Sequence, residues 1–376
     1  MKVKAQKIRH VLVLLILWAI GFLAWEWWYS FPKVTLAKIA PEENLHGKID
    51  SILYQAITDY RLPSLSLAVV LDGKVSYLNA IGYEDLQTKK LLTIDTPILV
   101  ASVSKIFTAL GVASVFQDKG ITAQDYVRLL DSDARGDSTM LDSLTYHRLL
   151  THQSGLRDKN FSEMIFSFSK SQSLQDWGAD FLKNGNKFQT GSVTYSYADT
   201  NFDLLGYLLS RSENLPFDSI IQTSVLTPSG MVNSRFINSW PLEGNGLTGY
   251  QRTFLWKRLE PKRIRFRIFP SPSSGLLTTT KDMSLALIHL LRGEMGIYHK
   301  ALDWLSAGET EAPLSFQKRQ INGAEWIGHF GGQAGYSSLL FYSKEVEMGI
   351  FLFANVNDDE NFRVEIANQV ISAISQ

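Results

Sequence analysis

A serine and a lysine three residues apart are the most informative chemical pair in the chain. Ser102 and Lys105 lie in the segment 96–120, where an apolar run leads into an amphipathic helix pattern. Side chains at positions i and i+3 share one helix face, so the hydroxyl and the amine should lie side by side. The positive end of the helix dipole would lie where a serine alkoxide forms. A serine beside a lysine that can lose its proton is one way to make an activated nucleophile.

The Ser-x-x-Lys spacing by itself is weak evidence of catalysis, because short motifs recur by chance. It also occurs at Ser30/Lys33, Ser167/Lys170 and Ser315/Lys318. Only after Lys105 do apolar residues continue a helical face, at Ile106, Phe107, Leu110, Ala113 and Val115. The alternative interpretation is a helix start at Ser102 with an exposed lysine.

The sequence patterns around this pair predict an α+β fold with an antiparallel sheet that would position Ser102 and Lys105. Alternating apolar residues between Asp-Gly and Asn-Gly turn pairs predict strands in hairpins, and apolar residues three and four apart predict helices. Expected helices cover 43–60, 280–292 and 360–375, and expected strands cover 64–71, 74–80, 272–278, 314–320, 326–331, 336–342 and 347–355. Residues 44–100 and 271–376 would form the sheet with the N- and C-terminal helices, and residues 101–270 an inserted, mainly helical region.

The first 29 residues are predicted to anchor the chain in a membrane. Four basic residues lie within the first nine, and an uncharged run follows over 11–25. Three aromatic residues, Trp27, Trp28 and Tyr29, come shortly after that run and could extend the membrane-spanning segment. This order favours one membrane helix with a cytoplasmic N-terminus and the rest of the chain outside. The uncharged run is shorter than the roughly 20 residues of a typical span.

A cleaved signal peptide and a buried core helix are the alternatives to an anchor. No small-x-small cleavage site follows the apolar run, and a basic start argues against a core helix. We therefore expect a single-pass cell-membrane protein. Residues 30–43 would be a tether, and residues 44–376 a domain facing the cell exterior or the periplasm.

Composition excludes several classes of function. Lys plus Arg and Asp plus Glu each number 37 among 376 residues, so the net charge is zero and nucleic acid is not an expected partner. The absence of cysteine excludes disulfides, thiolate zinc sites and cysteine nucleophiles. The seven histidines show no metal-binding spacing, so we expect neither a metal nor another cofactor. Nothing in the sequence indicates an oligomeric state.

A basic cluster lies in residues 252–267, with aromatic residues between the charges. Its basic residues are Arg252, Lys257, Arg258, Lys262, Arg263, Arg265 and Arg267, and Glu260 is its only acid. The simpler interpretation is a solvated surface strand or loop. The alternative, which the predicted anchor favours, is contact with anionic lipid headgroups or a cell-wall polyanion.

Five short motifs together resemble one known group of enzymes. They are Asp72-Gly73 leading to Gly82-Tyr83, Ser102-Val103-Ser104-Lys105, Leu149 to Leu156 (LLTHQSGL), Tyr197-Ala198-Asp199, and His329-Phe330-Gly331. Their order resembles the serine β-lactamase and penicillin-binding protein superfamily over residues 44–375. The chain is most similar to the class C β-lactamase-like branch, with its D-alanyl-D-alanine carboxypeptidases, D-aminopeptidases and esterases.

The resemblance implies roles for three residues in making an acyl-enzyme. Ser102 would be the acylated nucleophile, Lys105 would help to remove its proton, and Tyr197 would act as general base or proton relay. A tyrosine with an ordinary pKa of ~10 needs a nearby ammonium to do this at neutral pH. The alternative for Tyr197 is a buried aromatic with a satisfied hydroxyl.

The resemblance also implies substrate-binding residues. Asp199 stands where the family often has asparagine; it could pair with Lys105 but would bind a substrate carbonyl less well. His329 stands where class C β-lactamases usually have lysine, and it is a weaker anchor for a carboxylate. Gly331 and Gly332 would allow close approach of another backbone, and the N–H groups of Ser102 and Gly332 would form the oxyanion hole.

Together these features predict a membrane-anchored serine hydrolase that forms an acyl-enzyme on Ser102. The substrate would be a small molecule or peptide with an amide or ester bond, such as a D-amino-acid peptide of the cell wall. His329 and Asp199 argue against efficient β-lactam hydrolysis, although a genuine β-lactamase remains an alternative. A non-catalytic sensor or binding module that keeps the fold is the other alternative.

Overall fold

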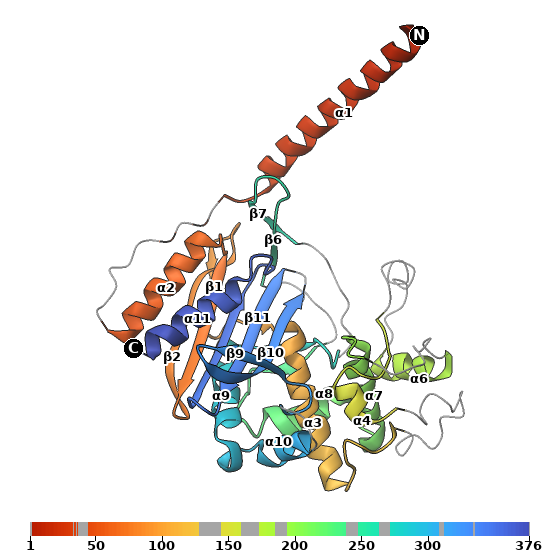
Figure 1. Ribbon diagram of the computed structural model, residues 1–376, viewed down its shortest axis with the longest axis vertical. Helices are drawn as coiled ribbons and strands as arrows, with labels where there is room; N and C mark the ends of the chain where they lie inside the picture. The colour runs from red at the N-terminus through yellow and green to blue at the C-terminus, as the bar shows by residue number, and fades with distance from the viewer. Residues whose placement is uncertain are drawn as a thin grey trace.

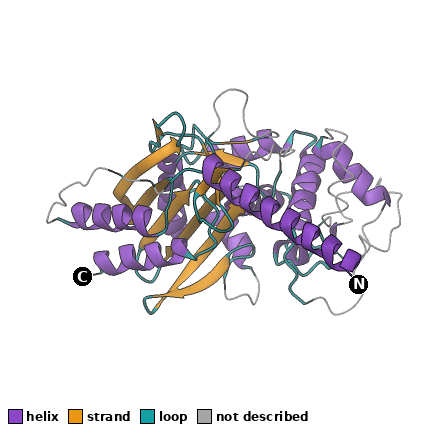
Figure 2. Cartoon of the chain, turned by 90° about the horizontal axis from the view of Figure 1, so that it is seen from above, coloured by secondary structure: helices purple, strands orange, loops and turns teal. Residues whose placement is uncertain are grey.

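The chain forms an α+β domain from which one long helix projects (Figure 1). The computed structural model describes residues 2–32, 34, 36, 44–127, 144–158, 173–184, 194–237, 247–262, 271–307, 312–333 and 335–375. Within these residues, helices cover both faces of a central antiparallel sheet, which the view from above also shows (Figure 2). The predicted fold class is therefore confirmed.

The central sheet joins the two ends of the domain. Its strands are β1 (Ser64–Leu71), β2 (Lys74–Asp85), β3 (Lys90–Leu91), β9 (Gln317–Ile321), β10 (Ala324–Gln333), β11 (Tyr336–Ser343) and β12 (Met348–Ala354). Their order across the sheet is β3-β2-β1-β12-β11-β10-β9. Because β1 pairs antiparallel with β12, the first and last strands of the chain lie side by side at its centre.

Two hairpins form where the sequence predicts them. Between β1 and β2, Asp72 and Gly73 have φ of 49° and 69°. Between β9 and β10, Asn322 and Gly323 have φ of 48° and 81°. Positive φ at both central residues is the conformation of a type I′ turn, whose twist matches that of the flanking strands.

Two helices cover one face of the sheet, and a third covers the other. α2 (Leu45–Asp59) begins at Asn44, whose side chain accepts a hydrogen bond from the Gly47 N–H at 2.8 Å. Its buried residues recur every three or four positions, at Ile49, Leu53, Ala56 and Ile57. α11 (Phe362–Ile374) lies beside α2 (Figure 1), and α9 (Thr280–Leu291) packs on the opposite face.

The inserted region is mainly helical, as predicted. Its helical elements are η1 (Ala101–Val103), α3 (Ser104–Asp118), α4 (Tyr146–Leu150), α6 (Leu174–Asn184), α7 (Thr200–Glu213), α8 (Phe217–Ile221) and η3 (Gln222–Leu226). Short strands near or within it are β4 (Ile98–Leu99), β5 (Arg235–Phe236), β6 (Tyr250–Arg252) and β7 (Leu259–Pro261). Two further helices, η4 (Gly293–Met295) and α10 (His299–Ser306), follow α9.

The strand expected at 272–278 does not join the central sheet. Only β8 (Leu276–Thr278) is extended, and it pairs with β4 and β5 in a separate three-stranded sheet. The preceding residues form a turn, because the N–H groups of Ser274 and Gly275 both donate to the Ser271 carbonyl. This turn lies at the candidate site, where its Ser273 carbonyl accepts a hydrogen bond from Lys105.

The N-terminal helix α1 (Lys2–Tyr29) is held at its C-terminal end by the β6–β7 hairpin. Residues 6–29 are long and apolar enough to cross a membrane, and the apolar 18-residue window within them is not buried in the domain. Glu26 accepts a hydrogen bond from the Leu255 N–H at 3.2 Å. The Arg258 guanidinium lies 4.1 Å from the Trp27 ring centroid and donates to the Ser30 hydroxyl at 2.8 Å.

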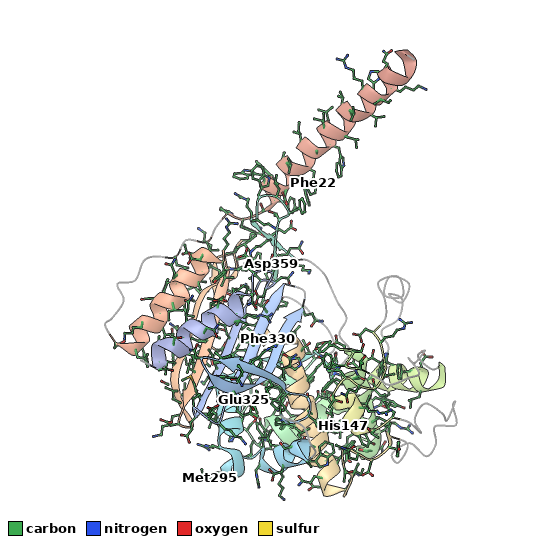
Figure 3. The ribbon with its side chains drawn as sticks, in the orientation of Figure 1. Phe22, His147, Met295, Glu325, Phe330 and Asp359 are labelled. Carbon is green, nitrogen blue, oxygen red and sulfur yellow. The ribbon has the colours of Figure 1, made fainter. Side chains whose placement is uncertain are left out.

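Two arginines of the basic cluster therefore have defined partners. Arg252 is almost fully buried, forms an ion pair with Asp359 (labelled in Figure 3), and donates to the Tyr60 carbonyl at 2.6 Å. Arg258 holds the end of α1. The interpretation of this cluster as a solvated surface strand or loop is wrong for Arg252, whose side chain is 1% exposed, whereas Arg258 is partly exposed. Arg263, Arg265 and Arg267 lie outside the described residues.

Candidate active site

Ser102 is placed by a sharp bend between β4 and α3. Ala101, just before it, has a left-handed φ of 48°. The sequence predicted Ser102 in the first turn of the α-helix, whereas the structure places it in the 3₁₀ turn η1 that precedes α3. The tighter turn arises because the Val103 N–H bonds back to the Val100 carbonyl at 3.2 Å. Strained residues such as Ala101 cluster at functional sites.

Side chains from distant parts of the chain meet at this serine. Lys105 Nζ lies 3.1 Å from Ser102 Oγ, and Tyr197 Oη lies 2.9 Å from the same oxygen. Lys105 Nζ also donates to Asp199 Oδ1 at 2.7 Å and to the Ser273 carbonyl at 3.0 Å. The side chain of Lys105 is fully buried, so the alternative of an exposed lysine is wrong.

Lys105 is held as an ammonium ion. Burial disfavours its charge, but the Asp199 carboxylate and then the Tyr197 hydroxyl outweigh this effect and raise the pKa of Lys105 above its ordinary value. Three hydrogen bonds use the three protons of the ammonium group. Near pH 7 this lysine has no lone pair to offer, so its influence on Ser102 is electrostatic.

Tyr197 is the group beside Ser102 that can exchange a proton with it. Its ring stacks on the His152 imidazole with centroids 4.4 Å apart, and Lys105 Nζ lies 4.9 Å from the ring centroid. Tyr197 is 40% exposed, so it is not a buried core aromatic.

His152 supports Tyr197 as a neutral imidazole. Its Nδ1 accepts the Ala198 N–H at 3.2 Å, and the Asn201 side-chain amide lies 3.1 Å from the same nitrogen. Burial and then the Lys105 charge lower the pKa of His152 to about 4. The backbone of His152 is left-handed, with φ of 56°, which ends α4 and turns the ring toward the site.

Asp158 is a site residue that the sequence patterns missed. Its carboxylate accepts hydrogen bonds from the N–H groups of Asp199 at 3.0 Å and Thr200 at 2.9 Å. These contacts satisfy free N–H groups at the start of α7 and thereby fix the segment that carries Tyr197. A single aspartate in an irregular loop carries no motif, so no local signal could have identified it.

Asp203 is a second missed residue, partly buried close to the Lys105–Asp199 ion pair. Its carboxylate accepts the Ser273 N–H at 3.0 Å and the Ser271 hydroxyl at 3.3 Å. It therefore holds the turn whose Ser273 carbonyl binds Lys105. Burial, and then the charge of Asp199, raise the pKa of Asp203 to about 7.

β10 brings its glycines against the nucleophile turn. A Cβ on Gly331 would lie 2.1 Å from the Val100 carbonyl oxygen and 2.3 Å from Ser338 Oγ, so only glycine fits. This confirms the close backbone approach that the sequence predicted there. A Cβ on Gly332 would meet no atom within 4 Å. His329 lies on the same strand and is buried next to the site.

Arg363 reaches this strand from α11 and was also missed. Its Nη1 donates to the carbonyls of Gly331 at 2.6 Å and Ser338 at 2.7 Å, and Asp358 accepts its Nε at 2.7 Å. In a trans peptide the Gly332 N–H points away from the Gly331 carbonyl. Arg363 thus fixes the peptide plane to which the predicted oxyanion donor belongs.

The acidic and imidazole groups of the site are engaged by protein partners. Asp158, Asp199 and Asp203 accept the hydrogen bonds given above, and the Nδ1 atoms of His152 and His329 face backbone groups. In the part of the chain that the structure describes, no three His, Asp or Glu side chains are grouped so as to hold a metal ion.

Comparisons with known sequences place the chain among related proteins. A profile of the Beta-lactamase family matches residues 49–373. The chain is 22% identical over 376 residues to a Beta-lactamase from Psychrobacter immobilis, with 88% of each chain covered. It is 21% identical over 341 residues to Protein flp from Staphylococcus aureus (strain COL), covering 85% of this chain but only 66% of that protein.

Solved structures show the same fold. The D-amino acid amidase from Ochrobactrum anthropi SV3, complexed with L-phenylalanine amide, matches with a TM-score of 0.75 and 20% identity over 88% of this chain and 99% of that one. The octameric penicillin-binding protein homologue from Pyrococcus abyssi matches with a TM-score of 0.69 and 20% identity, covering 88% and 77%. Because the family profile spans most of the domain, the chain belongs to the Beta-lactamase family, within the serine β-lactamase and penicillin-binding protein superfamily.

Proposed function

We propose that this protein is a serine hydrolase that forms an acyl-enzyme on Ser102. The observation that carries the proposal is the position of Ser102 Oγ, 3.1 Å from the Lys105 ammonium and 2.9 Å from Tyr197 Oη. A nucleophile within hydrogen-bond reach of a base that is itself oriented by neighbours is the signature of covalent catalysis. Membership of the family supports the same reaction class.

In the proposed acylation step, Ser102 Oγ attacks the carbonyl carbon of an amide or ester. Its proton passes to Tyr197 Oη, which in this proposal takes part as a phenolate beside the Lys105 ammonium. The carbonyl oxygen becomes an oxyanion that the N–H groups of Ser102 and Gly332 would bind, each contributing ~3 kcal/mol to the transition state. Tyr197 then returns the proton to the leaving amine or alcohol as the carbon–heteroatom bond breaks.

In the proposed deacylation step, water takes the place of the leaving group. Tyr197 again accepts a proton, now from the water, whose oxygen attacks the acyl carbon. Breaking the ester bond to Ser102 Oγ releases the acid, and the proton returns to the serine. The same residues thus serve both halves of the reaction.

The proposed substrate is a small amide or ester, such as a D-amino-acid peptide of the cell wall. The structural likeness to a D-amino acid amidase supports amides of D-amino acids. The sequence likeness to a Beta-lactamase keeps β-lactam hydrolysis as a second candidate. The complete set of Ser102, Lys105 and Tyr197 contacts favours an enzyme over a non-catalytic binding module.

The activity is tested with the full chain solubilised in detergent. A fluorophosphonate probe should label the wild type and leave Ser102→Ala unlabelled, whereas Ser167→Ala, from another Ser-x-x-Lys pair, should label normally. Turnover is then measured on a D-phenylalanine amide, a D-alanine ester and a chromogenic cephalosporin. Equal labelling of Ser102→Ala would refute the proposed nucleophile, and saturable binding without turnover of any substrate would favour the binding module.

We also propose that α1 anchors the protein in the cell membrane, with the domain outside. Its length and apolar, fully exposed surface support this placement. The full chain should remain in the membrane fraction after alkaline carbonate washing, and a chain that starts at residue 30 should be soluble. External protease should digest the domain in intact spheroplasts. Release into the medium of a chain shortened at its N-terminus would instead indicate a cleaved signal peptide.

A further inference from the structure

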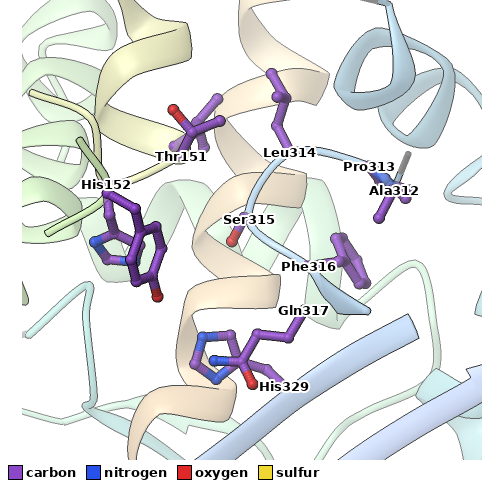
Figure 4. A pocket seen from close by; sticks show the side chains of 11 residues that line it. Thr151, His152, Ala312, Pro313, Leu314, Ser315, Phe316, Gln317 and His329 are labelled. Carbon is purple, nitrogen blue, oxygen red and sulfur yellow. The ribbon is translucent and has the colours of Figure 1, made fainter. Parts of the chain in front are cut away.

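A cavity of about 200 Å³ lies beside the catalytic group and shares two residues with it. His152 and His329 are on its wall, and His152 is the ring on which Tyr197 stacks. The wall is completed by Leu150, Thr151, Tyr195, Ala312, Pro313, Leu314, Ser315, Phe316 and Gln317 (Figure 4). None of these lining residues, in the part of the chain that the structure describes, is Lys, Arg, Asp or Glu. Charged side chains act on the lining residues from outside the list: Lys105 on both imidazoles and on Tyr195, Asp158 on His152, and Arg319 on Tyr195.

His329 presents a hydrogen-bond acceptor rather than a positive charge. Its Nδ1 lies 2.5 Å from the Phe330 carbonyl oxygen. A carbonyl only accepts, so Nδ1 carries the proton and donates it. In the neutral ring Nε2 therefore has a lone pair. His329 is 3% exposed, so protonating Nε2 as well would place a charge out of reach of water.

His152 presents the opposite polarity, again without charge. Its Nδ1 accepts the Ala198 N–H at 3.2 Å, and a backbone N–H can only donate. The proton of the neutral ring is therefore on Nε2. The cavity thus has one imidazole donor and one imidazole acceptor on its wall, among mainly apolar groups.

The charged groups around these rings also keep them neutral. Burial is the largest cause of the lowered pKa of His152 and of His329, and the charge of Lys105 on α3 is the second cause for both. His152 also lowers the pKa of His329 slightly. Asp158 partly offsets this at His152. The pKa values are about 4 for His152 and about 3 for His329. Both rings are uncharged throughout the range in which the enzyme would be assayed.

We propose that this cavity is the specificity pocket of the enzyme and takes an uncharged, mainly apolar group of the substrate, while rejecting a carboxylate. The inference rests on the proposed serine hydrolase activity. A carboxylate in the cavity would lose its hydration and find no cation on the wall. An aromatic or aliphatic group, or a carboxamide that can both donate and accept, would leave neither imidazole without a partner.

The test compares substrates that differ only in the charge of one group. On the acyl side these are the 4-nitrophenyl esters of (4-carbamoylphenyl)acetic and (4-carboxyphenyl)acetic acid. On the leaving side they are D-alanyl-D-alanine peptides with a C-terminal carboxamide or a free carboxylate. For the full-length enzyme, kcat/KM should favour the uncharged member of at least one pair by about 30-fold or more. Equal values in both pairs, or a preference for the carboxylate, would overturn the inference.

A variant tests whether the neutral ring causes the preference. His329→Lys places an ammonium at the cavity wall and should raise kcat/KM for the carboxylate relative to its uncharged partner by about tenfold or more. His329→Gln, which stays neutral, should keep the wild-type preference. The folding of both variants is checked by thermal unfolding. If His329→Lys does not fold, His329→Gln and the pH series decide the question.

The pH series uses the wild-type enzyme between pH 5 and 8. The preference for the uncharged substrate should stay constant, because neither imidazole gains a proton in this range. If the carboxylate substrate improves as the pH falls through about 6.5, the ordinary pKa of histidine, the pocket contains an imidazolium anchor and the inference is wrong. Loss of fluorophosphonate labelling and of all turnover would instead indicate that the proposed function itself is wrong.

Discussion

At the scale of single residues, the contacts of Lys105 are the basis of the proton transfer that we propose. Its ammonium is paired with Asp199 at 2.7 Å, and three acceptors use its protons. In the proposed mechanism the lysine therefore acts by stabilising negative charge beside it, and Tyr197 is the general base.

Replacing Tyr197 with phenylalanine tests this assignment. The ring can keep its stacking on His152, so the fold should be preserved, but the proton acceptor is lost. We expect kcat to fall by about 100-fold to 10,000-fold, the usual effect of removing a general base, with a small change in KM. Steady-state kinetics on an ester substrate measures this. Tyr126→Phe, at a tyrosine that is 52% exposed and does not line the cavity, is the matched control and should retain activity.

At the scale of secondary structure, β10 and the nucleophile turn are in direct backbone contact. Gly331 packs against the Val100 carbonyl, and Arg363 on α11 holds the Gly331 carbonyl from behind. The strand edge and η1 therefore form one rigid unit. Its geometry requires glycine at position 331 and leaves space for a side chain at position 332.

Alanine substitutions at Gly331 and Gly332 should therefore have different effects on stability. Gly331→Ala forces a Cβ to within 2.1 Å of the Val100 oxygen, so we expect it to lower the free energy of unfolding by at least about 1–3 kcal/mol. Gly332→Ala has open space and should unfold close to the wild type. Urea denaturation of both variants measures the difference. Similar destabilisation of the two would contradict the proposed packing.

At the scale of the whole molecule, the site forms where three parts of the chain meet. α3 supplies Ser102's neighbour Lys105, the segment before α7 supplies Tyr197 and Asp199, and β10 supplies the glycine edge. Bringing these parts together places the partly buried Asp203 near Asp199. The assembled site therefore contains one carboxyl group that the folded protein keeps protonated up to about pH 7.

Asp203 should make the stability of the whole domain depend on pH. Its pKa is 3.8 for the model compound and about 7 in the folded state. Between these values the folded protein holds a proton that the unfolded chain has lost, so stability falls as the pH rises through this window. Asp203→Asn removes this dependence, and its stability relative to the wild type should increase from pH 4 to pH 8 by up to about 4 kcal/mol.

Urea denaturation at several pH values measures this effect. Asp218→Asn, at an exposed aspartate in the first turn of α8, is the matched control and should show no such trend. If the wild type and Asp203→Asn differ by a constant amount at every pH, Asp203 does not titrate in the way its burial implies.

The central fold could be predicted from the sequence because its signals are local. Asp72-Gly73 and Asn322-Gly323 specify hairpin turns through positive φ at both residues, and the apolar spacing of α2 specifies one buried face. The prediction of a strand over all of 272–278 was wrong because Ser274 and Gly275 turn back and donate to the Ser271 carbonyl. The apolar pattern does not encode such a turn.

The sequence by itself determined the α+β fold, the apolar N-terminal helix and the candidates Ser102, Lys105 and Tyr197, because each follows from spacing or from a short motif. Only the tertiary structure decided that Lys105 is buried as an ammonium, that His152 and His329 are neutral, and that Asp158, Asp203 and Arg363 support the site. Charge and tautomer depend on which groups surround a side chain after folding. Those neighbours come from positions up to hundreds of residues away, where no local pattern can record them.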